Sequence, residues 1–91
     1  MSAILNTYNR KKISFKRGKG SFLYDSNGKR YLDFVQGIAV NCLGHSHAYL
    51  NKAIQKQSKK LWHVSNAFII PEQEKLAKRL KQKTFADYVF F

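Results

Sequence analysis

The chain has 91 residues, of which 44% are hydrophobic and 14% aromatic. A polypeptide of this length forms at most one small domain with a thin core. Its apolar content excludes a disordered tail, because such tails lack the hydrophobic residues that offset the entropy lost on ordering. Seventeen Lys and Arg against five Asp and Glu give a formal net charge of +12, which raises the question of an acidic partner such as nucleic acid.

Cysteine usage and hydropathy indicate where the chain works. Cys42 is the only cysteine, and small secreted domains usually need several disulfides. The sequence also lacks an apolar run long enough for a signal peptide, or for the roughly 18 residues that a membrane-spanning helix needs. We therefore expect a cytoplasmic protein that does not enter a membrane.

The first third of the chain predicts strands. Residues 1–12 begin polar and end basic, and we expect them to form a loosely held N-terminal arm. Residues 13–37 alternate short aromatic and aliphatic runs with turn formers, a pattern typical of short strands. Asn27 and Gly28 lie between two such runs, and both tolerate the positive φ that a primed two-residue hairpin turn requires. The pattern predicts a β-meander of about three short strands, with Gly37 ending the last one.

A loop and two amphipathic helices follow. Residues 37–47 show no persistent period and predict a loop packed against protein. Ser46 is suited to cap a helix that starts near Ala48 and ends before Ser65, with lysines on its outer face. Pro71 suits the first turn of a second helix, because the amide hydrogen that proline lacks would be unpaired there.

The last residues, 88–91 (Tyr-Val-Phe-Phe), form a dense apolar run of strand-forming residues. Such a run is typical of a buried parallel strand, which needs neighbours on both edges and helices on both faces. This chain is too short to supply them. We therefore expect either a piece of a larger α/β domain or a chain whose last residues pair with a partner.

Several stretches, in their order and spacing, resemble the class III aminotransferases of fold type I, and among them the acetylornithine aminotransferases. The stretches are FKRGKGSFLYDSNGKRYLDF, GIAVNCLGH, HVSNAF, IPEQEKLAKRL and DYVFF. The resemblance covers nearly the whole chain, but only about a quarter of the length that a two-domain chain of that family would need. It implies an α+β or α/β fold. Residues 13–91 would be the N-terminal lobe, truncated before the cofactor-binding domain, and the last run would begin a strand of the large domain.

The resemblance also implies an activity. It is the transfer of an amino group between N-acetylornithine and 2-oxoglutarate/glutamate in arginine biosynthesis, with pyridoxal phosphate as cofactor and a homodimer as the assembly. In this family a lysine, an aspartate and a glycine-rich loop hold the cofactor. None of these motifs occurs here, so we assign no catalytic or cofactor-binding residue and expect the segment alone to be inactive. Ornithine, succinylornithine and 4-aminobutyrate aminotransferases are the alternatives within the family.

Six residues in two segments match, by resemblance, the wall of the substrate pocket: Gly37, Ile38, Val40, Ser65, Asn66 and Ala67. In ornithine-specific relatives a bulky polar ring takes the place of Gly37, so glycine leaves room for an acylated substrate. Plain loop geometry explains the same residues without a pocket, since Gly37 can end a strand and Asn66 can form a turn.

Other functional patterns are weaker. His45 and His47 lie near Cys42, but a zinc site needs three or four ligands at suitable spacing, and we expect packing or capping roles and no metal. Asp33 is expected to accept backbone hydrogen bonds. The alternative from a different class is a small basic nucleic-acid-binding module. Against it, the aromatics occupy core-like positions and are not interleaved with basic residues as a stacking platform requires, so we expect no nucleic-acid partner.

Overall fold

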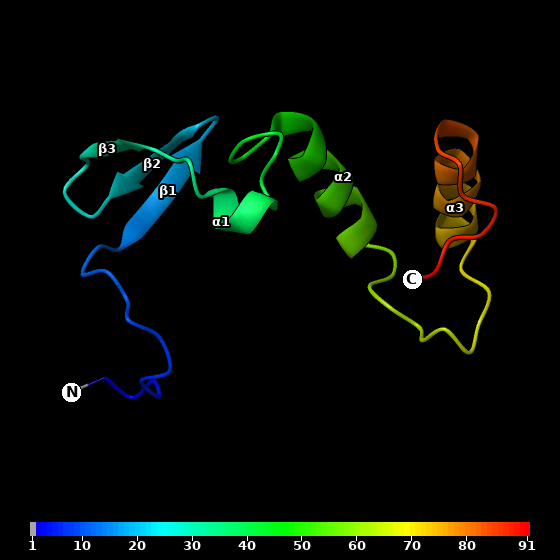
Figure 1. Ribbon diagram of the computed structural model, residues 1–91, viewed down its shortest axis with the longest axis horizontal. Coiled ribbons are helices and arrows are strands. Elements are labelled where there is room, and N and C mark those ends of the chain that lie inside the picture. The colour runs from blue at the N-terminus through cyan, green and yellow to red at the C-terminus, as the bar shows by residue number, and fades with distance from the viewer. Residues whose placement is uncertain (1) are drawn as a thin grey trace. The chain divides into compact units, whose positions relative to one another are not determined.

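Figure 1 shows the computed structural model, which describes residues 2–91. The chain divides into two compact units, one up to Lys56 and one from Gln57 to Phe91. The first unit holds a small sheet, a short helical turn and most of a second helix. The second unit holds one longer helix and the segments that flank it.

The first unit is built on a three-stranded antiparallel sheet with the strand order β1-β2-β3. β1 spans Phe15–Lys19, β2 spans Phe22–Asp25 and β3 spans Arg30–Leu32. The predicted meander of three short strands is therefore confirmed, but its last strand ends at Leu32 and not at Gly37, which lies in the following turn.

The turn between β2 and β3 differs in type from the prediction. Gly28 is the only residue of the turn with a positive φ (+79°), whereas a primed two-residue turn needs two such residues at its centre. The Gly28 N–H donates to the Asp25 carbonyl (3.1 Å), and the Asp25 N–H donates to the Lys29 carbonyl (3.1 Å). The Asp25 carboxylate also accepts hydrogen bonds from the N–H groups of Asn27 (2.8 Å) and Lys29 (3.0 Å). This side chain therefore favours a longer turn.

One face of the sheet carries mainly apolar side chains, with the Asp25 carboxylate beside Tyr31. The rings of Phe15 and Tyr31 meet edge to face, with their centroids 5.5 Å apart. Leu23 pairs with Tyr31 in the strand register, and cross-strand partners point to the same face. This face contains the apolar side chains from which a core could be built.

The opposite face alternates arginines with aromatic rings. Tyr24 pairs with Arg17 on β1 and with Arg30 on β3. The guanidinium carbon of Arg17 lies 3.6 Å from the centroid of the Tyr24 ring, and that of Arg30 lies 4.6 Å from the centroid of the Phe22 ring. The expectation that aromatic and basic side chains are not interleaved is therefore wrong on this face. The cause is the two-residue period of the strands, which brings both kinds of side chain to one side.

The loop predicted after β3 contains one helical turn, α1 (Gln36–Ala39), and this turn is left-handed. Its four residues have φ values of +54°, +62°, +64° and +61° in chain order. The N–H groups of Ile38 and Val40 donate to the carbonyls of Val35 (2.8 Å) and Gln36 (3.0 Å). L-residues avoid this conformation because Cβ approaches a carbonyl oxygen, so hydrophobic periodicity does not predict it.

α2 spans Ala48–Ser58, and the predicted start of this helix is confirmed. Ser46 does not have the predicted capping role. Its φ is +54°, outside the extended region of an N-cap, and its hydroxyl donates to the Gly18 carbonyl (2.9 Å). Trp62 lies beyond the end of this helix, and its indole N–H donates to the Ser58 carbonyl (2.9 Å).

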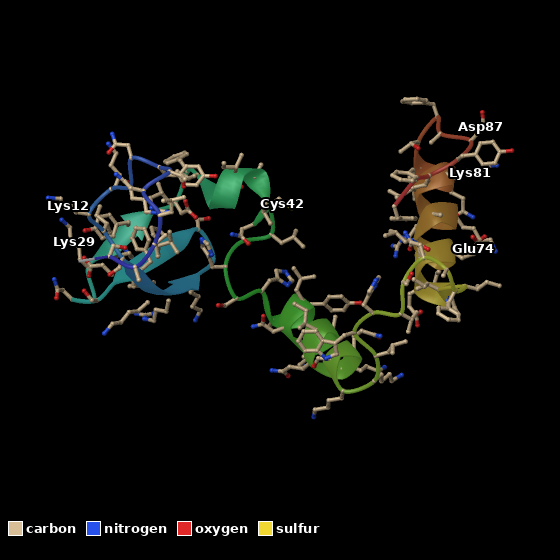
Figure 2. All side chains as sticks on the ribbon, turned by 90° about the horizontal axis from the view of Figure 1, so that it is seen from below. Lys12, Lys29, Cys42, Glu74, Lys81 and Asp87 are labelled. Carbon is tan, nitrogen blue, oxygen red and sulfur yellow. The ribbon has the colours of Figure 1, made fainter. Side chains whose placement is uncertain are left out.

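α3 spans Pro71–Lys83 and begins at the predicted proline. Glu72 and Glu74 lie in its first turn, and Lys81 and Lys83 lie in its last turn. These charges complement the helix dipole at both ends, and Figure 2 shows Glu74 and Lys81 projecting from this helix. No helix among residues 2–91 is both long and apolar enough to cross a membrane.

The strand predicted at residues 88–91 does not form in this structure. The segment after α3 has no regular secondary structure and pairs with no strand in the described part of the chain. Tyr88 is 94% exposed and Phe90 is 99% exposed. A strand needs a neighbouring strand to exchange backbone hydrogen bonds, and residues 57–91 contain none.

Neither unit has a hydrophobic core. No hydrophobic residue among residues 2–91 is fully buried, and in the first unit Phe34 is 87% exposed. Complete burial of a large apolar side chain stabilises a protein by about 1.5–3 kcal/mol. The described residues do not obtain this stabilisation from one another, so their apolar surface is available to other polypeptide.

Gly28 provides a test of the β2–β3 turn. A methyl group added there would meet open space, so the penalty of Gly28→Ala comes from the positive φ alone. We expect a cost of about 1 kcal/mol and roughly fivefold faster amide hydrogen exchange in β2 and β3, measured by NMR. Gly28→Asn should have a smaller effect, because asparagine tolerates positive φ. Equal exchange rates in all three proteins would contradict this account.

Candidate functional site

Asp33, the residue that follows β3, organises the loop after the sheet. Its Oδ1 accepts hydrogen bonds from the backbone N–H groups of Val35 (3.0 Å) and Gln36 (2.9 Å), which confirms the predicted acceptor role. Its Oδ2 lies 2.6 Å from Nε2 of His45. An ionised carboxylate can only accept, so Nε2 is the donor. The side chains of Asp33 and His45 are only 6% and 18% exposed.

The Asp33 hydrogen bonds hold the beginning of the left-handed turn α1. Gln36, whose N–H donates to Asp33, is the first of the four residues with positive φ. Three of the four are not glycine, and each such residue costs roughly 1–2 kcal/mol in this conformation. Residues held in disfavoured conformations cluster at functional sites, where the surrounding structure constrains them. The turn therefore marks this part of the first unit as a candidate site.

The loop that carries His45 is fixed to the sheet. The His45 N–H donates to the Gly20 carbonyl (2.8 Å), and the Gly20 N–H donates to the His45 carbonyl (3.0 Å). A Cβ on Gly18 would lie 2.6 Å from Cγ of His45, and a Cβ on Gly44 would lie 3.0 Å from backbone atoms of Gly20. Only glycine fits at these two contacts, and the loop therefore lies directly on the sheet.

The candidate site borders a hollow of about 560 Å³ beside the apolar face of the sheet. Phe15, Tyr31 and Gly37 line this hollow, together with Asp33 and His45. The hollow therefore combines apolar walls with one carboxylate and one imidazole, and these two polar groups bind each other.

Three of the six predicted pocket residues lie in the first unit, within or beside α1. Gly37 has a φ of +62° and lines the hollow. The side chains of Ile38 and Val40 are exposed. The structure thus brings these three residues into one turn, with the glycine at the hollow.

The other three predicted pocket residues lie in the second unit, between α2 and α3. Asn66 borders a hollow of about 560 Å³ that residues of α3 and of the terminal segment also line. Its Oδ1 accepts a hydrogen bond from Nε2 of Gln73 (3.4 Å). Ser65 has a φ of +74°, and its Oγ accepts a hydrogen bond from the Ala67 N–H (3.2 Å). These contacts describe a local turn, which is the geometry that the plain-loop alternative predicts.

His45 is the site residue whose partner the sequence does not reveal. Asp33 lies 12 residues earlier, and no periodic pattern links the two positions. The available signal is the pair of glycines at 18 and 20, which can admit a bulky ring close to the backbone. The neighbouring Cys42 is exposed (Figure 2), and no group of three or more His, Cys, Asp or Glu side chains in residues 2–91 could hold a metal ion.

The hydrogen bonds to Asp33 change the pKa of its carboxyl group. The backbone N–H of Gln36 and the His45 side chain lower this pKa from its ordinary value of 3.8, and partial desolvation opposes them. The fold therefore stabilises the ionised carboxylate.

Acid titration tests this stabilisation. Because the pKa of Asp33 is lower in the folded chain than in the unfolded chain, the contribution is complete above pH 3.8 and is lost as the pH falls through the lowered value. Asp33→Asn should remove this part of the acid transition, followed through the NMR signals of residues 33–45. Asp87→Asn, which alters an exposed carboxylate of the second unit, should leave it in place. An acid transition that is the same in Asp33→Asn and the unmodified chain would contradict the assignment.

Comparison with known proteins assigns the chain to a family. The family described as aminotransferase class-III matches residues 4–91. The acetylornithine aminotransferases of Agrobacterium fabrum and Brucella melitensis are each 53% identical to the chain over 88 residues, which cover 97% of the chain and 22% of each relative. The chain therefore spans about a fifth of the length of these curated relatives.

Solved structures agree with this assignment. The N-acetylornithine aminotransferase of Stenotrophomonas maltophilia has a TM-score of 0.75 and 37% identity, over 86% of the chain and 21% of that protein. The ornithine delta-aminotransferase of Plasmodium falciparum has a TM-score of 0.84 and 32% identity, over 90% of the chain and 21% of that protein. Because the family match includes 88 of 91 residues and the fold is shared, this chain belongs to the class III aminotransferases.

Proposed function

We propose that this chain is the N-terminal part of an acetylornithine aminotransferase, which transfers an amino group between N-acetylornithine and 2-oxoglutarate/glutamate in arginine biosynthesis. The observation that carries the proposal is the 53% identity, over almost the whole chain, to proteins named acetylornithine aminotransferase. The proposed enzyme is cytoplasmic and dimeric, as the resemblance implies. Residues 1–12 form its N-terminal arm, and residues 13–91 belong to its N-terminal lobe.

Sequence identity, and not the fold, favours acetylornithine as the substrate. Ornithine aminotransferases have the same backbone arrangement, with a TM-score of 0.84 at 32% identity. Two folds that agree this well cannot separate an acylated substrate from a free amine, since selectivity arises from side chains in a pocket. The succinylornithine and 4-aminobutyrate enzymes remain alternatives within the family for the same reason.

The chemistry around Gly37 supports an acylated substrate. The acetyl group removes the positive charge of the distal amine, so the pocket needs volume and no paired carboxylate. Among the residues that line the hollow beside Gly37, Asp33 is the only acidic one, and both of its oxygens already accept hydrogen bonds within the chain. A distal ammonium group would therefore meet only a carboxylate that three hydrogen bonds already engage, whereas a neutral amide requires no carboxylate.

Class III aminotransferases use pyridoxal phosphate, and the ornithine aminotransferase of Toxoplasma gondii holds it at its active site. A lysine that binds the cofactor's aldehyde must be shielded from water so that its pKa falls. All thirteen lysines of this chain are exposed in the structure. Because the family's cofactor motifs do not occur in this sequence, we place the cofactor's binding residues in the part of the relatives that this chain does not match.

The exposed apolar surface fits a role as one part of a larger protein. Phe34 in the first unit and Phe90 in the second are almost fully exposed. In the proposed enzyme, other polypeptide covers these side chains, and residues 88–91 pair with strands of the large domain. Such contacts would provide the burial that neither unit obtains by itself.

A chimaera tests the proposed function. Residues 4–91 would replace the matching segment of the Agrobacterium fabrum acetylornithine aminotransferase, and glutamate formation from N-acetylornithine and 2-oxoglutarate would be measured. We expect kcat/KM within about tenfold of the parent, because a well-fitting segment should lose less than about 1.4 kcal/mol of transition-state stabilisation.

The matched control carries the corresponding segment of the Plasmodium falciparum ornithine delta-aminotransferase, which has the same fold at 32% identity. It should retain less activity with acetylornithine than the first chimaera. The proposal fails if the first chimaera folds and dimerises but has no activity above that of the control.

Gly37 provides a second test in the same chimaera. Gly37→Tyr places a bulky polar ring at the hollow, so kcat/KM for N-acetylornithine should fall by about 10- to 100-fold, relative to that for ornithine. Gly37→Ala separates conformation from volume, because its Cβ would lie 3.5 Å from Asn41 without a clash and would only strain the positive φ. A selectivity ratio that is unchanged in Gly37→Tyr would remove Gly37 from the pocket wall.

The arginine–aromatic face of the sheet and the positive net charge favour the nucleic-acid alternative. Arg17 and Arg30 are stacked on rings there, and the chain carries a net charge of +12. If this face binds phosphates, the 91-residue chain should retain single-stranded RNA at low salt. Arg17→Gln combined with Arg30→Gln should then reduce the slope of log K for RNA binding, plotted against the logarithm of the salt concentration, by about 1–2. The aminotransferase proposal predicts no such retention at 150 mM salt, a condition that screens weak surface charge.

A further inference from the structure

We propose that Asp33 and His45 form a positioning pair that keeps residues 36–39 left-handed and thereby sets the position of Gly37 in the pocket wall. The conformational part of this inference depends only on the contacts within the first unit. Its consequence for substrate selectivity rests on the proposed function.

The first step is the orientation of the Asp33 carboxylate. A carboxylate that is free to rotate about χ2 presents either oxygen in either direction. Nε2 of His45 holds Oδ2 at 2.6 Å, and this contact directs Oδ1 toward the N–H groups of Val35 and Gln36. Because charge-assisted hydrogen bonds are short and strong, the imidazole selects the carboxylate orientation that starts the turn.

The second step is the position of His45 itself. Two backbone hydrogen bonds join His45 to Gly20 at the end of β1, and the ring lies against Gly18. Its place is therefore set by the sheet and not by the turn. The pair transmits the position of β1 to α1 through one side-chain contact, across 12 residues of sequence.

The third step is the need for such a constraint. Gln36, Ile38 and Ala39 have positive φ values, although only Gly37 adopts them at no steric cost. Without an external acceptor for the N–H of Gln36, the segment would relax toward conformations with negative φ. Gly37 would then leave its place at the hollow.

The first experiment uses the chimaeric enzyme, in which other polypeptide covers the apolar surface, and measures amide hydrogen exchange in the segment that contains residues 33–39. His45→Leu removes the Nε2 donor and should speed exchange at Val35 and Gln36 by about tenfold or more, the value of one charge-assisted hydrogen bond. His45→Gln retains an Nε2 donor and should restore protection to within about threefold. Asp25→Asn changes a carboxylate with a similar role in the β2–β3 turn and should not affect these two amides.

The amides of β2 and β3 report whether the sheet survives each substitution. Loss of protection confined to residues 35–39 supports the pair. If His45→Leu also removes the protection of the β2 and β3 amides, the His45→Gln variant decides the matter. Restored protection in that variant supports the hydrogen-bond donor role, and no restoration indicates simple ring packing. Unprotected Val35 and Gln36 in the unmodified chimaera, or equal exchange in the leucine and glutamine variants, would overturn the inference.

The second experiment uses the chimaeric enzyme and separates this inference from the proposed function. His45→Leu should raise KM for N-acetylornithine by about 10- to 100-fold with a smaller change in kcat, because a displaced wall weakens substrate positioning. His45→Gln should recover most of the loss, and Asp25→Asn should match the parent. An inactive parent chimaera would reject the proposed function and leave the exchange result intact. An active parent with an unchanged KM in His45→Leu would reject the positioning role alone.

Discussion

The carboxylate of Asp33 is the point on which the arrangement of the first unit depends. It follows β3 directly, and its two oxygens receive hydrogen bonds from a turn on one side and from an imidazole on the other. Such a small sheet has little packing with which to fix a loop. A nearly buried ionised group with three donors replaces that packing with directional bonds, whose loss would leave a buried charge without partners.

Exposed apolar surface is the second constraint. Unlike the hydrogen bonds of Asp33, it is not satisfied by contacts among the described residues. The hydrogen-bonded cluster around Asp33 is internally satisfied, whereas the side chains that would form a core remain open to solvent in both units. A chain of this composition is too apolar to be a flexible tail, yet its described residues do not cover one another. Membership of a family whose relatives are much longer accounts for both facts, because additional polypeptide can cover the same surface.

The parts of the structure that follow from local chemistry were predictable, and the parts that depend on distant contacts were not. Strand alternation predicted the meander, and Pro71 predicted the start of α3. The hairpin turn differs because the Asp25 carboxylate binds two N–H groups, a contact that the Asn27-Gly28 signal does not contain. Ser46 was expected to cap α2, but its hydroxyl binds a carbonyl of β1, 28 residues earlier in the chain. The strand predicted at 88–91 does not form, because residues 57–91 contain no other strand with which it could pair.

Gly37, which we propose as part of the pocket wall, shows how far sequence reasoning could explain a residue of this site. Resemblance suggested that glycine provides room for an acyl group, but in the structure a Cβ at this position would make only ordinary contacts, with Asn41 at 3.5 Å, and the φ of +62° is the stricter demand. Glycine therefore meets a conformational requirement before it meets a steric one. In the proposed enzyme, volume at this residue would become decisive where other polypeptide closes the hollow, so the same residue would serve both the fold and selectivity. A backbone held by Asp33 and His45 connects the two roles, because a wall can discriminate between substrates only if it does not move.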